Sequence, residues 1–195
     1  MNVFLTSKAF LYDQDVFEQF LAWVEINRFS KRMISITTAQ RNKEERKRYE
    51  NQFKELLMRS GFEELEFIDI EFENPELLRK FPLICIQGGD PFYLLDQIKK
   101  SKTDSILIDL YNEGRIFIGH SSGAAVMGNT ISHANLLHPE WNTIDMIDFK
   151  AVGIIDEIIL PHCNRYIDKH EEIRTYEEEI GKDLLKIEDG QYIIL

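Results

Sequence analysis

The residues best suited to chemistry lie in the stretch GRIFIGHSSGAAVMG, which runs from Gly114 to Gly128. Within it, Gly119, Ser121 and Gly123 match the pattern G-x-S-x-G, in which a serine is exposed at a sharp turn between a strand and a helix. Glycines on both sides leave room for such a strained turn. The stretch therefore predicts Ser121 as a nucleophile for acyl transfer, and the alternative is a purely structural turn.

A serine that attacks a carbonyl carbon generates an oxyanion, which needs hydrogen-bond donors close by. The N–H group of Ser122 is one expected donor, because it directly follows the nucleophile and opens the next helix. Gly88 and Gly89 end the apolar run FPLICIQGGD and are the second expected source, since glycine lets the backbone approach a ligand closely. A helix-entry turn is the alternative explanation for the two glycines.

The nucleophile also needs a general base, which in enzymes is most often a histidine. We expect this base to be His162, because it ends the apolar segment EIILPH, and ligands of parallel sheets bind at the carboxyl ends of strands. The alternative for His162 is a hydrogen bond that only holds its loop. The remaining histidines are expected to point away from the serine or to lie in a loop or on a charged helix: His120, His133, His138 and His170.

An acidic residue is expected to hold the imidazole of the base. The chain order serine, acid, histidine is one known solution of this geometry, and Glu140, Asp145 and Asp148 all lie between Ser121 and His162. Each of the three is, taken alone, also compatible with a solvated loop position. The sequence therefore leaves the identity of the acid open among them.

Strand-like and helical segments alternate along all 195 residues without a linker, which predicts one catalytic domain over residues 1–195. Continuous apolar strands predict a doubly wound, mostly parallel sheet with helices on both faces. Strands are expected at 2–7, 33–39, 65–71, 81–87, 115–119, 157–162 and 191–195. Helices are expected at 14–29, 44–62, 91–101, 105–114 and 168–185.

The composition narrows the class of function. A net charge of -11 argues against nucleic acid as a partner, because phosphate binding needs a concentrated basic surface. The two cysteines, Cys85 and Cys163, form neither a disulfide framework nor a metal pattern. No apolar run reaches the roughly 20 residues of a membrane span, and the N-terminus lacks a signal-peptide layout, so we expect a cytoplasmic protein without membrane contact.

Four stretches, in this order, resemble the peptidase E and cyanophycinase family of serine peptidases: FLTS, ICIQGGDPFYLL, IFIGHSSGAAVMGNTI and GIIDEIILPH. The resemblance implies a three-layer fold like that of the class I glutamine amidotransferases. It also implies that Ser121 is the nucleophile, that His162 is the base, and that Gly88, Gly89 and Ser122 form the oxyanion hole. Family members hydrolyse peptide bonds next to aspartate without a metal or other cofactor, so the expected partner is a small peptide. The oligomeric state is left open between monomer and homodimer.

The resemblance also bears on the acid and on substrate binding. Members similar to cyanophycinase place a glutamate near Glu140, which implies Glu140 as the third member of the triad. Asp90 stands where the family has an asparagine in its strand-end motif. An aspartate side chain in the substrate needs a cation, which Arg174 or Arg165 is expected to supply; alternatively, Arg174 pairs with acids on its own helix. Two other functions remain open, a non-catalytic binding module and an esterase or amidase.

Overall fold

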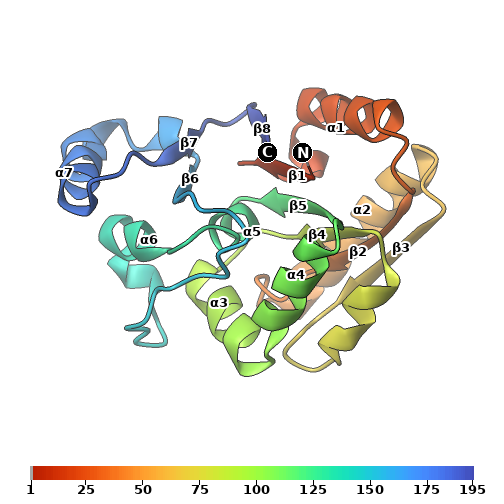
Figure 1. Cartoon of the computed structure of the whole chain (residues 1–195), viewed down its shortest axis with the longest axis horizontal. Coiled ribbons are helices and arrows are strands. Elements are labelled where there is room, and N and C mark those ends of the chain that lie inside the picture. Colours follow the sequence, from red (N-terminus) through yellow and green to blue (C-terminus); the bar gives the residue numbers. More distant parts are fainter. Residues whose placement is uncertain (1) are drawn as a thin grey trace.

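The computed structural model describes residues 2–195, whose centre is a six-stranded sheet with the order β3-β2-β4-β5-β1-β8 (Figure 1). All neighbouring strands are parallel except β1 and β8, which are antiparallel. The strands are β1 (Val3–Thr6), β2 (Arg32–Ile36), β3 (Glu64–Ile68), β4 (Leu83–Ile86), β5 (Ile116–His120) and β8 (Tyr192–Ile194). The expected mostly parallel sheet is thus confirmed.

Helices cover both faces of this sheet. The α-helices are α1 (Gln14–Ile26), α2 (Lys43–Arg59), α3 (Pro91–Lys100), α4 (Thr103–Asn112), α5 (Ser122–Ala125), α6 (Ser132–Leu137) and α7 (His170–Ile180). Short 3-10 helices are η1 (Phe10–Tyr12), η2 (Pro75–Lys80), η3 (Pro139–Trp141), η4 (Cys163–Arg165) and η5 (Ile167–Lys169). Phe4 packs with α1 and α2 on one face, whereas Val3 and Leu5 pack with α3, α4 and α5 on the other. Side chains that alternate across β1 therefore bury two separate apolar layers.

The segment expected as one helix over 168–185 contains two elements. Helix α7 ends at Ile180 because Gly181 adopts a left-handed conformation, with φ +65°. The chain then forms β7 (Leu185–Ile187), which pairs in parallel with β6 (Ile159–Pro161) in a second, two-stranded sheet. The 168–185 expectation is therefore wrong at its end, and this small sheet lies beside the main one, near β8 (Figure 1).

The remaining expectations from composition concern cysteines and membranes. Cys85 lies fully buried in β4, where burial raises the pKa of its thiol to about 12 and leaves it unreactive at neutral pH. Both cysteines are free thiols. None of the helices within residues 2–195 has the length and apolar character needed to cross a membrane.

The aromatic cluster beneath α1 predicts a large cost for truncating Phe20. This side chain is fully buried, and its ring stacks on Phe10 with 4.5 Å between centroids. We expect Phe20→Ala to lower the free energy of unfolding by about 3–5 kcal/mol, measured by urea denaturation. Phe72 is 67% exposed, so Phe72→Ala should change it by about 0.5 kcal/mol or less. Equal effects of the two variants would contradict this description of the core.

Candidate active site

The turn between β5 and α5 holds Ser121 in a strained backbone conformation, with φ +52°. The turn packs directly on the end of β4: a Cβ atom added at Gly123 would lie 2.0 Å from the carbonyl oxygen of Ile86. A Cβ added at Gly88 would lie 2.8 Å from the Cβ of Ser121. Only glycine fits at either position, so the sequence pattern reflects a close approach of two strand ends.

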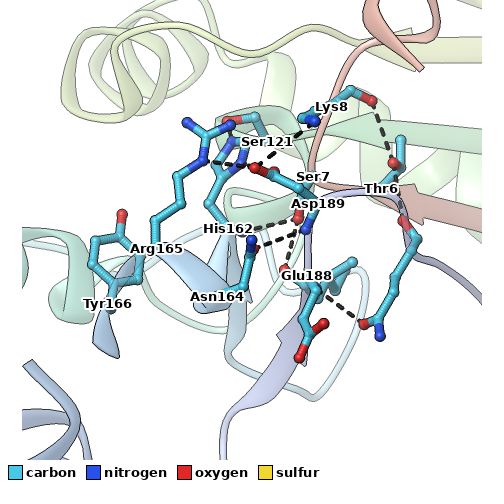
Figure 2. A network of polar contacts seen from close by, with 12 residues as sticks. Thr6, Ser7, Lys8, Ser121, His162, Asn164, Arg165, Tyr166, Glu188 and Asp189 are labelled. Atoms are coloured by element: carbon cyan, nitrogen blue, oxygen red, sulfur yellow. Dashed lines mark hydrogen bonds and ion pairs between the residues drawn. The ribbon is translucent and has the colours of Figure 1, made fainter. Parts of the chain in front are cut away.

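Ser121 and His162, 41 positions apart in the chain, lie within hydrogen-bond distance. The hydroxyl Oγ of Ser121 is 2.9 Å from Nε2 of His162 (Figure 2). His162 directly follows β6 and has a left-handed backbone conformation, with φ +59°. The structure therefore brings together the two residues that the sequence analysis paired.

The carboxylate next to the imidazole comes from Asp189, which the sequence analysis did not consider. Its Oδ1 lies 2.6 Å from Nδ1 of His162, and its Oδ2 accepts a 2.7 Å hydrogen bond from Nε of Arg165 (Figure 2). The backbone N–H of Asp189 donates to Oδ1 of Asn164 at 2.9 Å. Asp189 lies in the turn between β7 and β8, and the dipeptide Asp189–Gly190 before the last strand is a sequence signal that could have indicated this turn.

A buried hydroxyl connects the segments that carry these groups. Ser7, at the end of β1, accepts a 2.8 Å hydrogen bond from the backbone N–H of His162. The same hydroxyl donates a 2.7 Å hydrogen bond to the carbonyl oxygen of Ile187 in β7. The ends of β1, β6 and β7 are thereby fixed relative to one another, and the orientations of His162 and Asp189 follow from this arrangement.

None of the three acids expected to hold His162 lies next to it. Glu140 accepts a hydrogen bond from Nδ1 of His138 at 3.1 Å, and Asp148 pairs with Lys99 at 2.8 Å. The side chain of Asp145 makes no hydrogen bond or ion pair within residues 2–195, and its backbone N–H donates to the carbonyl oxygen of Asn142 at 3.4 Å. The cause is the path of the chain, since residues after α6 return toward α5 through a bridge between Thr130 and Lys150. The assignment of Glu140 beside the base is therefore wrong.

Unpaired backbone donors lie next to the Ser121 hydroxyl. The N–H groups of Gly88, Gly89 and Ser122 have no hydrogen-bond acceptor among residues 2–195. In addition, the Ser122 hydroxyl donates a 2.6 Å hydrogen bond to the carbonyl oxygen of Gly89, which ties the two strand-end loops together. These N–H groups are available to an oxygen that develops negative charge near Ser121.

The residues expected to bind substrate take other positions. Asp90 caps α3, because its Oδ1 accepts from the N–H groups of Phe92 and Tyr93, both at 3.0 Å. Arg174 lies on α7 and pairs with Glu171 at 2.6 Å, as its helical spacing allowed. Neither Asp90 nor Arg174 lines a cavity at Ser121. Arg165 does, although its Nε is bound by Asp189.

Two cavities meet at Ser121 and His162. The first, of about 390 Å³, lies beside α2, and we call it the Tyr49 cavity; it is also lined by Arg48, Lys8 and Gln87. The second, of about 540 Å³, lies beside α6 and is lined by Trp141 and His133, and we call it the Trp141 cavity. Their volumes are typical of small-ligand sites. No group of three side chains suited to bind a metal ion occurs within residues 2–195.

The electrostatics of the site favour a neutral imidazole beside a charged carboxylate. Burial lowers the pKa of His162 below its usual 6.5, and the hydrogen bond that the ring donates to Asp189 only partly opposes this effect. Burial raises the pKa of Asp189, but the hydrogen bonds from Arg165 and His162 outweigh it and bring that pKa below 3.8. At neutral pH, His162 can therefore accept a proton from Ser121.

Titration of the histidine ring by NMR tests this description. We expect the pKa of His162 to lie below 6.5. Asp189→Asn should lower it further, because a charged partner that favours imidazolium is lost. Arg165→Gln should raise it, because a nearby positive charge is lost. Glu140→Gln serves as the matched control and should leave it unchanged, and a shift in that variant alone would contradict the geometry.

The arrangement has the geometry of serine-dependent acyl-transfer sites on doubly wound sheets. The family model of Peptidase family S51 matches residues 3–195, and the chain therefore belongs to this family, as its resemblance to peptidase E implied.

Solved and curated relatives agree with this membership. The crystal structure of a putative peptidase E protein from Listeria monocytogenes matches with a TM-score of 0.79 and 25% identity, covering 100% of this chain and 93% of that chain. An uncharacterized peptidase of the same organism is 28% identical over 105 residues, 54% of this chain. Peptidase E of Salmonella arizonae is 26% identical over 110 residues, 56% of this chain. The matched part spans about half the length of these two curated relatives, 51% and 46%.

Proposed function

We propose that this chain is a serine peptidase that hydrolyses small peptides through an acyl-enzyme. Ser121 is the nucleophile, His162 is the general base, and Asp189 orients the base. One observation carries the proposal: Nε2 of His162 lies 2.9 Å from the Ser121 hydroxyl while its Nδ1 lies 2.6 Å from Asp189. Membership in Peptidase family S51 supports the same reaction class.

The reaction follows from these positions. Oγ of Ser121 attacks the peptide carbonyl carbon while Nε2 of His162 takes the hydroxyl proton. The negative charge on the carbonyl oxygen is stabilised by N–H groups of Ser122 and of Gly88 or Gly89. His162 then donates its proton to the leaving amine, which breaks the peptide bond. A water molecule, deprotonated by His162, attacks the ester carbonyl carbon. His162 then returns this proton to Oγ of Ser121 as the ester bond breaks, and the carboxylic acid product leaves.

The two cavities on either side of Ser121 support a substrate that extends in both directions from the scissile bond. The family resemblance also implied a preference for aspartate. The two arginines expected to bind that side chain do not support it, because Arg174 pairs with Glu171 and Arg165 with Asp189. The proposal is therefore a peptidase for small peptides, without a requirement for aspartate.

Replacement of the nucleophile tests the proposal most directly. Ser121→Ala should reduce peptide hydrolysis by about 10³-fold or more and abolish labelling by a fluorophosphonate probe, because no other hydroxyl within residues 2–195 contacts the imidazole of His162. Ser105 lies on α4 and bonds only to a backbone carbonyl, so Ser105→Ala is the matched control and should remain fully active and labelled. A Ser121→Ala variant with wild-type turnover would overturn the proposal.

The identity of the acid predicts a second difference. Asp189→Asn should lower kcat by about 10²–10⁴-fold, because the tautomer and orientation of His162 are no longer fixed. Asp148→Asn is the matched control. It removes a carboxylate that pairs with Lys99 and does not contact His162, so turnover should not change. Steady-state kinetics on one peptide, with circular dichroism to verify folding, separates the two variants. Equal kcat values for Asp189→Asn and the wild type would exclude Asp189 from the reaction.

A further inference from the structure

The Trp141 cavity has a rigid aromatic wall. The His138 ring stacks on Trp141 with 3.7 Å between centroids and an angle of 3° between the planes. Both nitrogens of His138 are bound, Nδ1 to Glu140 at 3.1 Å and Nε2 to the hydroxyl of Tyr166 at 3.2 Å. The wall is therefore preorganised, and Glu140 acts on this ring instead of on His162.

The floor of the same cavity is apolar. Leu137 and Leu160 line it and are each only 1% exposed, and Pro91 and Ala125 complete the surface toward Ser121. A flat, apolar group placed here would bury its faces against the stacked rings and the leucines.

One polar side chain in this cavity lacks a partner. His133 lies on α6, is only 3% exposed, and neither of its ring nitrogens forms a hydrogen bond with residues 2–195. Burial lowers its pKa to about 4, so the ring is neutral and offers one donor and one acceptor. Nδ1 is fully buried and Nε2 is not, so a ligand in the cavity would pair with Nε2, and pairing with this unsatisfied nitrogen adds affinity. A hydroxyl group satisfies either tautomer, because it both donates and accepts.

The charges around the cavity do not favour an acidic ligand. Arg165 is paired with Asp189, and Lys169 directs one of its N–H groups to the carbonyl oxygen of Leu137. Asp168 also lines the cavity and adds a negative charge. An acidic ligand would meet the negative charge of Asp168 together with the positive charge of Lys169, so the two charges oppose each other.

We propose that the Trp141 cavity binds the side chain of a tyrosine next to the scissile bond, with its ring against Trp141 and its hydroxyl on His133. This assignment rests on the proposed function, because the cavity opens on Ser121 and His162. It makes His133 a residue that determines specificity, with no part in the chemical step.

Two series of dipeptides test the preference, X-Ala and Ala-X, with X as tyrosine, phenylalanine or aspartate. In the series that places residue X in the Trp141 cavity, kcat/KM should be highest for tyrosine. It should be roughly tenfold lower for phenylalanine, because one hydrogen bond is lost. Aspartate should be the poorest of the three in that series. Faster cleavage of the aspartate peptide than of the tyrosine peptide in both series would overturn the assignment.

Variants locate the preference in the cavity. His133→Phe should make tyrosine and phenylalanine peptides equally good substrates, because the hydrogen-bonding group is lost while the ring volume is kept. Trp141 is 46% exposed, so Trp141→Ala should fold and should lower kcat/KM for both peptides alike. His170→Phe, at an exposed position on α7, is the matched control and should keep the wild-type ratio. An unchanged tyrosine-to-phenylalanine ratio in His133→Phe would refute the role of His133.

A binding measurement separates this assignment from the proposed function. Trp23, the other tryptophan, is buried in the core, so quenching of fluorescence by a ligand in the cavity reports on Trp141. N-acetyl-tyrosine amide should bind the Ser121→Ala variant more tightly than its phenylalanine counterpart, and His133→Phe should remove the difference. Binding without hydrolysis of any peptide by the wild type would refute the peptidase and keep the cavity assignment. Equal binding of the two amides would refute the cavity assignment alone.

Discussion

The site depends on the contact between the ends of β4 and β5, where two backbones approach too closely for any side chain. A Cβ atom at Gly123 would lie only 2.0 Å from the carbonyl oxygen of Ile86, which is too close for any side chain. This contact fixes the start of α5, and with it the strained conformation of Ser121 and the unpaired N–H group of Ser122. The strain in the serine backbone is tolerated because the surrounding sheet, buried on both faces, determines it.

The other half of the site is assembled from the chain ends of the fold. β1 supplies the Ser7 hydroxyl, β6 supplies His162, and the turn between β7 and β8 supplies Asp189. These segments lie far apart in sequence, and single hydrogen bonds join them at one point (Figure 2). A rigid sheet thus holds the hydroxyl, while a small network of polar contacts holds the imidazole and the carboxylate.

Local patterns were sufficient for much of the fold and for half of the site. Buried strands and a glycine-flanked serine have short-range signatures, and the positions of Ser121 and His162 at strand ends follow from the parallel sheet. Asp189 could not be found in this way, because its contact with His162 depends on the pairing of β6 with β7. That pairing lies in a segment whose charged composition favoured one long helix, and Gly181 alone marks the break. In addition, the chain order serine, acid, histidine places the acid before His162, whereas Asp189 lies 27 positions after it.

The edge strand β8 links the position of Asp189 to the stability of one edge of the sheet. It is three residues long, Tyr192–Ile194, and within the sheet it pairs only with β1. Edge strands of this kind detach in local openings that cost far less free energy than global unfolding. The adjoining turn carries Asp189, so the contact of its carboxylate with the imidazole depends on this edge as well as on the hydrogen bonds to His162 and Arg165. The local stability of this sheet edge therefore bears on how firmly the carboxylate is held against the imidazole.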